Sequence, residues 1–267
     1  MTVRLPPRPG VPATSRVNAG GTLRAAVALL TRLPVRPDDG VASGAAAFPV
    51  VGVIVGLVGF VPLVLGGAAQ PVLSSLLAIA AMTVLTGALH LDGLADTADA
   101  LLAPDPTTAE RARKDPAVGP GGAVALILVL GIEVAALAGL VASAGALTAG
   151  AALVVAAVVG RTLPVVAVLL AGSRATGSGF GGWFAARVGW GDATVAVGVA
   201  ALVTAGLAVA TASAEVAAAG IVGAGAGLAI GWAIVARRRQ LDGDGMGAII
   251  ELTVAASLAA AAYAYVI

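Results

Sequence analysis

The sequence predicts an all-α fold, a polytopic transmembrane helix bundle with about seven spans. Three observations predict it. The 267 residues are 59% hydrophobic and only 11% charged, with a mean hydropathy of +1.02, whereas soluble domains are about 45–50% apolar and about 25% charged. Apolar runs of about 20 residues, enough to cross a bilayer, recur along the chain. The 15 Lys and Arg residues gather in the segments that separate alternate runs.

The apolar runs divide the chain into a tail and one membrane domain. Residues 1–20 are rich in proline and lack a hydrophobic period, so we expect a disordered tail, followed by a single integral membrane catalytic domain over 21–267. Residues 21–33 predict a short amphipathic helix, too short to span. Spans are expected at 46–66, 72–89, 123–142, 147–170, 193–211, 216–235 and 248–267.

Glycines spaced by four residues within two spans predict close helix packing. They are Gly52 and Gly56 in one span, and Gly223, Gly227 and Gly231 in another. Small residues at this spacing let a neighbouring helix approach closely. The same glycines would also allow helices of two copies of the chain to pack together, so the sequence does not decide between a monomer and a homo-oligomer.

The charges test the span count. Every Lys and Arg except Arg161 falls within 1–45, 91–120, 172–192 or 236–247, the segments that alternate onto one side of such a bundle. By the positive-inside tendency this side is cytoplasmic. The net charge of +1 does not favour a nucleic-acid partner, and the absence of cysteine excludes thiolate metal sites and cysteine nucleophiles.

An acidic segment directly follows the second apolar run. If it is helical, Asp92, Asp96 and Asp99 lie at i, i+4 and i+7 and share one face within about 60°. Three acids on one stripe repel each other unless a cation lies against them. Carboxylates suit Mg²⁺, which binds a few carboxylates together with substrate phosphates. We therefore predict a Mg²⁺ site here; the alternative is a solvated helix face outside the membrane.

Further groups suited to phosphate lie in the other segments of the same side. They are a basic and acidic patch, a glycine-rich segment and an acidic Gly-Asp-Gly loop: Arg113, Lys114, Asp115, Arg174, Gly177, Gly243 and Asp244. Arginines bind phosphate oxygens, and glycines allow close backbone approach. Phosphoryl transfer needs mainly positioning and charge neutralisation. The alternative for the basic groups is anchoring to anionic lipid.

Four ionisable residues lie within or next to spans. Arg161 and Glu133 either pair with each other in the bundle interior or leave Arg161 to reach a phosphate. Glu251, near the start of the last span, either joins the metal site or supports the Gly-Asp-Gly loop. His90 is a candidate general base or proton donor, although a lone histidine at a membrane end is more often packed.

Several blocks of the chain resemble a known family. HLDGLADTADAL (90–101), RKDPAVGPGG (113–122), SRATGSGF (173–180) and GDGMGAIIEL (243–252) resemble, in order, the blocks of the cobalamin synthases. The Gly160-Arg161 pair with Pro164, and LLTRLPV (29–35) and FPVVGVIVG (48–56), match as well. The chain departs from the family's Leu-Gly-Gly-x-Thr-Gly-Asp run: Arg239 and Gln240 stand for the two glycines and Asp242 for the threonine.

The resemblance implies an activity. Cobalamin synthases (CobS) are adenosylcobinamide-GDP ribazoletransferases, membrane enzymes of cobalamin biosynthesis in the bacterial cytoplasmic (inner) membrane. The ribose hydroxyl of α-ribazole, or of its 5′-phosphate, attacks the cobinamide-side phosphorus of adenosylcobinamide-GDP, and GMP leaves. Mg²⁺ is the implied cofactor.

The resemblance also gives the candidate residues their roles. The metal ligands would be Asp92, Asp96, Asp99 and Asp244. Phosphate would be held by Arg113, Lys114, Asp115, Arg161, Arg174, Gly177 and Gly243, and Asp99, His90 and Lys114 are the catalytic candidates.

Other readings remain open at this stage. One is a CDP-alcohol-type phosphotransferase of lipid synthesis, which also has an aspartate-rich site at a membrane edge; the chain lacks that family's full spacing, since Ala95 is followed by Asp96. Another is a small transporter with Arg161 and Glu133 in its pathway, although the chain shows none of the internal repeats typical of transporters. A structural membrane protein whose acids bind counterions is the third.

Overall fold

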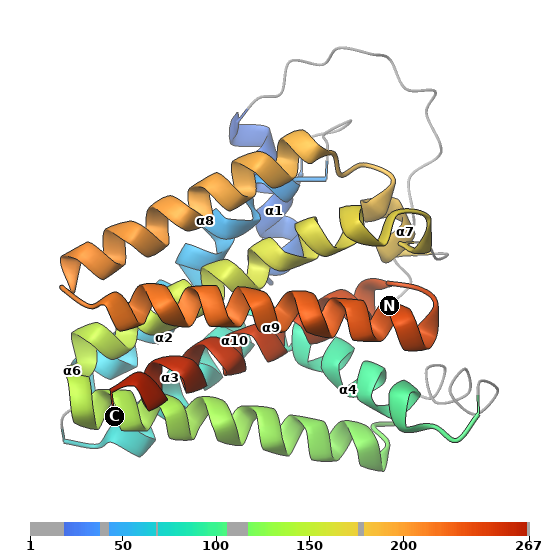
Figure 1. Cartoon of the computed structure of the whole chain (residues 1–267). Coiled ribbons are helices and arrows are strands. Elements are labelled where there is room, and N and C mark those ends of the chain that lie inside the picture. Colours follow the sequence, from blue (N-terminus) through green and yellow to red (C-terminus); the bar gives the residue numbers. More distant parts are fainter. Residues whose placement is uncertain (1–18, 38–42, 68, 106–116, 176–178, 266–267) are drawn as a thin grey trace.

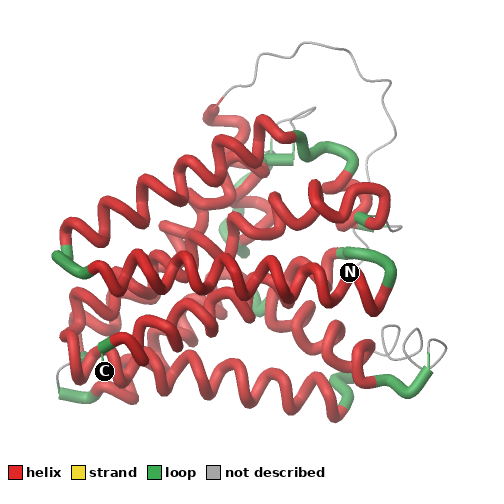
Figure 2. The backbone as a smooth tube through the Cα atoms, viewed as in Figure 1, coloured by secondary structure: helices red, strands yellow, loops and turns green. Residues whose placement is uncertain are grey.

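The structure is a computed structural model that describes residues 19–37, 43–67, 69–105, 117–175 and 179–265. Within these residues the chain consists of helices joined by short loops, without strands (Figure 2). The predicted all-α bundle is therefore confirmed. The predicted disordered tail lies almost entirely outside the described residues.

The helices follow the predicted apolar runs closely. In chain order they are α1 (Ala19–Leu30), the 3-10 turn η1 (Ala45–Ala47), α2 (Phe48–Gly66), α3 (Pro71–Thr86), α4 (Leu89–Leu102), α6 (Pro120–Ala171), η2 (Gly172–Arg174), α7 (Phe180–Ala185), α8 (Trp190–Ala210), α9 (Ala214–Arg238) and α10 (Gly243–Ala264). The short helix α7 lies in a segment that we expected to be a glycine-rich loop.

The third and fourth predicted spans form the two halves of α6. At Gly145 the backbone is not helical, with φ 84° and ψ 164°, a conformation open to glycine. In Figure 1 the first half of α6 runs from right to left along the bottom of the bundle, and the second half runs back towards the right-hand end, where α6 begins. Each half is about 37 Å long at about 1.5 Å per residue, sufficient to cross a bilayer.

The second predicted span ends earlier than expected. We placed its end at Leu89, but α3 ends at Thr86 and α4 is turned from it by 92°. The turn follows from two successive left-handed residues, Gly87 (φ 64°) and Ala88 (φ 57°), which cannot continue a right-handed helix. The acidic segment therefore forms a separate helix that crosses the bundle.

The number of membrane passes agrees with the prediction. Among the described helices, five are long and apolar enough to cross a membrane, and the bent pair α3–α4 counts as a sixth. Dividing α6 at its kink gives about seven passes. Large apolar side chains such as Leu65, Leu202 and Val209 are exposed on the outside, as expected for a surface that faces lipid.

The charged segments that follow α3 gather at one end of the bundle. Figure 1 shows the end of α4, the start of α6, α7 and the loop from α9 to α10 at the right-hand end. The turn between α8 and α9, the kink of α6 and the α2–α3 turn lie at the opposite end. The arrangement therefore supports the sidedness that the arginines predicted.

Helix α10 is the most enclosed span. In its most apolar stretch 67% of the residues are buried, against 17% in α8. It packs against α4, α6 and α9. The predicted glycine contacts are confirmed: a Cβ on Gly52 of α2 would lie 2.6 Å from the Cα of Val158 in α6, and Gly223 and Gly227 of α9 face Ser257 and Thr253 of α10.

Candidate functional site

Helices α4 and α10 cross with their backbones in contact. A Cβ on Gly93 would lie 2.8 Å from the carbonyl oxygen of Asp244, and one on Gly247 would lie 3.0 Å from the carbonyl oxygen of His90. A methyl group on either glycine would push the two backbones apart. The crossing brings the start of α10, with Asp244, against the half of α4 that carries Asp92 and Asp96, at the end of the bundle where the charged segments gather.

The acid stripe is helical, as predicted, but its members differ in environment. Asp92 is exposed, while Asp96 and Asp99 are half-buried. Among the residues that the structure describes, no three His, Asp or Glu side chains come close enough together to hold a metal ion. The structure therefore does not bring the predicted ligands Asp92, Asp96, Asp99 and Asp244 together as a metal site, and their role as ligands stays a prediction.

Asp99 is bonded to the start of α6. Its Oδ2 accepts a hydrogen bond from the Gly119 amide (2.8 Å), and its Oδ1 accepts one from the Gly122 amide (2.9 Å). A Cβ on Gly122 would lie 2.6 Å from Oδ2. The first amides of a helix lack partners within the helix and favour negative charge. These contacts favour Asp99 as a positioning residue that joins α4 to α6.

The loop from α9 to α10 is held by its own side chains. Arg238 donates to Asp242 at 2.7 Å, and Asp242 accepts the Gly245 amide at 3.0 Å as the N-cap of α10. Aspartate and threonine are both good N-cap residues, so Asp242 can serve where the resembling family has threonine. The Gly243 amide lies 2.8 Å from where a Cβ of Gly181 would be, so this loop packs against α7.

Four ionisable side chains meet in the bundle interior. His90 Nδ1 lies 3.6 Å from Glu251 Oε1, too far for a hydrogen bond. Glu133, Arg161 and Glu251 line a cavity of about 20 Å³, large enough for one water, which needs about 10–15 Å³. Glu133 and Arg161 are each 2% exposed, and Arg161 Nε and Nη1 have no hydrogen-bond partner in the described part of the chain.

This buried cluster joins three helices, α4, α6 and α10. His90 precedes Asp92 by two residues on α4, Glu251 follows Asp244 by two turns on α10, and Arg161 lies in the second half of α6. Arg161 and Glu133 both lie in the interior, but no ion pair between them is found among the described residues, and Glu251 and His90 belong to the same cluster. Arg161 is buried in this cluster at 2% exposure, which does not favour its predicted contact with a substrate phosphate.

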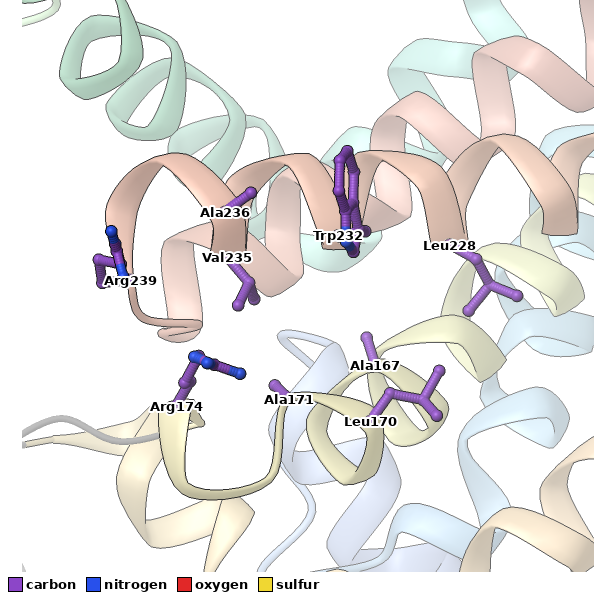
Figure 3. A pocket seen from close by; sticks show the side chains of 10 residues that line it. Ala167, Leu170, Ala171, Arg174, Leu228, Trp232, Val235, Ala236 and Arg239 are labelled. Carbon is purple, nitrogen blue, oxygen red and sulfur yellow. The ribbon is translucent and has the colours of Figure 1, made fainter.

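The remaining candidates lie apart or outside the described residues. Arg174 lines a second cavity, between the end of α6 and the end of α9 (Figure 3). Its carbonyl oxygen accepts the Leu241 amide at 2.8 Å, which ties its turn to the α9–α10 loop. Arg113, Lys114, Asp115 and Gly177 are not among the described residues, and their roles stay predictions.

Sequence reasoning missed three features of this end of the bundle. The bonding of Asp99 was signalled only by the glycines at 119, 121 and 122, whose amides open α6. The extent of the buried cluster was not predicted, because its members are far apart in the sequence. The cavity beside Arg174 had no signal, since most of its lining residues are ordinary apolar side chains of two spans.

Comparison with known proteins identifies a family whose model matches most of the chain. The family model CobS, cobalamin-5-phosphate synthase, matches residues 22–262. An adenosylcobinamide-GDP ribazoletransferase of Sinorhizobium medicae (strain WSM419) is 44% identical over 121 residues, which cover 42% of this chain and 46% of the relative. Proteins of the same name from Rhizobium etli (strain CIAT 652) and Brucella canis are 41% and 37% identical, over 46% and 48% of this chain and 51% and 52% of the relatives.

The curated relatives align with only part of the chain. The aligned part of the chain spans about half the length of the curated relatives. No solved structure matches the chain. The family model, by contrast, extends from α1 to α10 and includes the crossing of α4 and α10. The chain therefore belongs to the cobalamin-5-phosphate synthase family.

Proposed function

We propose that this chain is a membrane transferase that joins adenosylcobinamide-GDP to α-ribazole, or to α-ribazole 5′-phosphate, and releases GMP. The products are adenosylcobalamin or its 5′-phosphate. The observation that carries the proposal is the close backbone contact of α4 with α10 at Gly93 and Asp244, which lies within the family match and next to the aspartates of both helices in the sequence.

The reaction is a displacement at phosphorus. The ribose hydroxyl oxygen forms a bond to the cobinamide-side phosphorus, the bond from that phosphorus to the oxygen of GMP breaks, and the hydroxyl proton is released. Most of the catalysis in such reactions comes from positioning and from neutralising charge on the phosphates. In this chain the glycine contacts of the crossing fix Asp92, Asp96 and Asp244, and Asp99 fixes α4 to α6.

Mg²⁺ is part of the proposal. The donor set fits a hard divalent ion, which prefers carboxylate oxygens and completes its coordination with water and substrate phosphates. Since the described residues contain no three carboxylates within reach of one ion, we propose that Asp92, Asp96 and Asp244 come together on it only when substrate is bound. When bound, the ion would offset the negative charge of the diphosphate. Each oxygen of Asp99 accepts an amide hydrogen bond, so we assign Asp99 to positioning α4 against α6 rather than to the ion.

The proposal includes an orientation. The chain is a multi-pass membrane protein by its apolar helices and its family. We place it in the bacterial inner membrane with its N-terminus and its site in the cytoplasm. The cationic segments at the charged end support this orientation through the positive-inside tendency.

The test is a comparison of donor substrates with the purified, reconstituted chain. Incubation with adenosylcobinamide-GDP, α-ribazole and Mg²⁺ should give a cobalamin product by mass spectrometry, whereas a CDP-linked lipid should give none. Asp96→Asn and Asp244→Asn should lower turnover by at least about a hundredfold, as expected when a charged group near the reacting phosphates is lost. Glu215→Gln, at the opposite end of the bundle, is the matched control and should keep turnover. Activity with the CDP-linked lipid alone would assign the chain to the CDP-alcohol type of chemistry.

A further inference from the structure

A second cavity opens between α6 and α9, next to the charged end of the bundle. It has a volume of about 320 Å³, within the range of about 300–1,000 Å³ typical of small-molecule sites. Its walls are the end of α6 and the last turns of α9 (Figure 3). The small residues Ala167, Ala171 and Gly231 leave room between the two helices, and the carboxylates of the crossing are not among its lining residues.

The lining changes from cationic to apolar along α9. Arg174 and Arg239 line the cavity at the charged end, Trp232 lies beyond them, and Leu228 and Leu170 lie deeper along the helices. In Figure 3 the side chain of Arg174 extends into the gap below α9. From Arg239 to Leu228 the helix covers about 16 Å at about 1.5 Å per residue. This distance leads from headgroup level to the hydrocarbon of a bilayer.

Exposure places the apolar part of the cavity against lipid. Trp232 is 75% exposed and Leu170 is 62% exposed, although both lie on helices long enough to span. Tryptophan favours the membrane–water interface, which agrees with its position between the arginines and the leucines. An occupant can therefore enter sideways from the membrane.

Arg239 adopts a conformation that favours glycine. Its φ is 59°, at the C-cap of α9, and residues with a Cβ are disfavoured there. An arginine in such a position carries a cost to the backbone, and an observed outlier of this kind motivates a search for a use of its side chain. The use available in the structure is the cationic rim of the cavity, which it forms with Arg174.

From this geometry we propose that the cavity between α6 and α9 binds an anionic phospholipid. The phosphate of the lipid lies between Arg174 and Arg239, because arginine makes strong charge-assisted hydrogen bonds to phosphate. One acyl chain lies along Trp232, Leu228 and Leu170. Arg174, which the sequence suggested for substrate phosphate, is thereby assigned to lipid. The proposal does not depend on the transferase reaction.

The experiment uses Trp232 as a reporter. The full chain carries three tryptophans; Trp183→Phe and Trp190→Phe leave Trp232 alone. The protein is reconstituted in phosphatidylcholine vesicles that contain increasing fractions of brominated phosphatidylglycerol or brominated phosphatidylcholine. Brominated phosphatidylglycerol should quench Trp232 fluorescence at a lower mole fraction than brominated phosphatidylcholine, by about fivefold for each arginine involved. Equal quenching by the two lipids would overturn the proposal.

Variants separate a built site from general charge attraction. Arg239→Gly suits the backbone conformation and should fold at least as well as the parent, yet it should lower the preference for phosphatidylglycerol about fivefold; Arg174→Gln should do the same. Arg237→Gln removes one charge from the same end of α9 without touching the cavity and should keep the preference. If Arg237→Gln lowers the preference as much as Arg239→Gly, general attraction explains the effect and the proposal fails.

Two further experiments, one with a variant and one with inorganic phosphate, identify the molecule that occupies the cavity. Ala236→Leu fills the cavity from an exposed position while both arginines stay, and it should abolish the preference; an unchanged preference would contradict binding inside the cavity. Inorganic phosphate, added at millimolar concentration, should leave the quenching by phosphatidylglycerol unchanged. If it removes that quenching, the arginines bind a soluble anion and the lipid proposal is wrong.

Discussion

The contact between Asp99 and the start of α6 allows the sharpest prediction about a single side chain. Its carboxylate accepts two amide hydrogen bonds, at 2.8 and 2.9 Å. Hydrogen bonds to charged groups contribute about 1.5–3 kcal/mol each, and half-burial lets water replace part of this. We expect Asp99→Ala to lower the free energy of unfolding by about 2–4 kcal/mol. Asp99→Asn keeps one acceptor oxygen without the charge, so we expect about half of that loss.

One assay is unfolding of the purified protein in detergent, followed by circular dichroism. The other is Mn²⁺ binding in the presence of adenosylcobinamide-GDP, measured by electron paramagnetic resonance. Asp99→Asn should be less stable, and its Mn²⁺ affinity should fall by less than that of Asp92→Asn, because a positioning residue does not contact the ion. Asp92→Asn is the matched control: Asp92 is exposed on the same helix, so its loss should change stability by less than about 0.5 kcal/mol.

A second variant approaches the same contact from the other side. In Gly122→Ala the added methyl group would lie 2.6 Å from Asp99 Oδ2, so the carboxylate must move and stability should fall as it does in Asp99→Asn. The reasoning is refuted if Asp99→Ala unfolds like the parent while its Mn²⁺ affinity falls at least as far as that of Asp92→Asn. Asp99 would then be an ion ligand, as the sequence first suggested.

Three other predictions address the crossing, the buried cluster and the orientation. Gly93→Ala places a methyl group 2.8 Å from the Asp244 carbonyl oxygen. The methyl group should displace α10 and lower kcat by at least about tenfold, measured as turnover of the folded variant. Normal turnover would show that close contact of α4 with α10 is not needed for activity. Arg161→Met removes the cation from the buried cluster of carboxylates and should destabilise the protein by about 3–5 kcal/mol, measured by unfolding in detergent. Parental stability in this variant would show that Arg161 does not offset buried negative charge. Reporter fusions at Ala212 and Gln240 should report opposite sides of the membrane, and same-side signals would contradict the topology.

The fold was largely predictable because of the solvent that surrounds it. In a bilayer each backbone group must be satisfied within the segment that carries it, so an apolar run of about 20 residues has few options besides a helix. The bend before α4 was not predictable in the same way. It requires Ala88 at φ 57°, a conformation that its side chain does not favour and that tertiary packing imposes. The packing is visible at Gly87, where an added Cβ would collide with the side chain of Arg32.

The site was predictable in its composition more than in its connections. The spacing of Asp92, Asp96 and Asp99 correctly indicated one helix face. It could not show that Asp99 is bonded to amides about 20 residues later in the chain, since that contact depends on how α4 and α6 pack. The same holds for Arg161, whose neighbours in the interior come from helices far apart in the sequence.

The most direct measurement of the central claim, that the carboxylates at the crossing of α4 and α10 serve transfer from a nucleotide-linked corrinoid, is GMP release. The purified, reconstituted chain is incubated with adenosylcobinamide-GDP and Mg²⁺, with and without α-ribazole. The account predicts GMP equal in amount to the cobalamin formed, dependent on α-ribazole, abolished by EDTA, restored by Mg²⁺, and lost in Asp96→Asn. GMP release that persists undiminished in Asp96→Asn and Asp244→Asn, or that ignores EDTA, would contradict it.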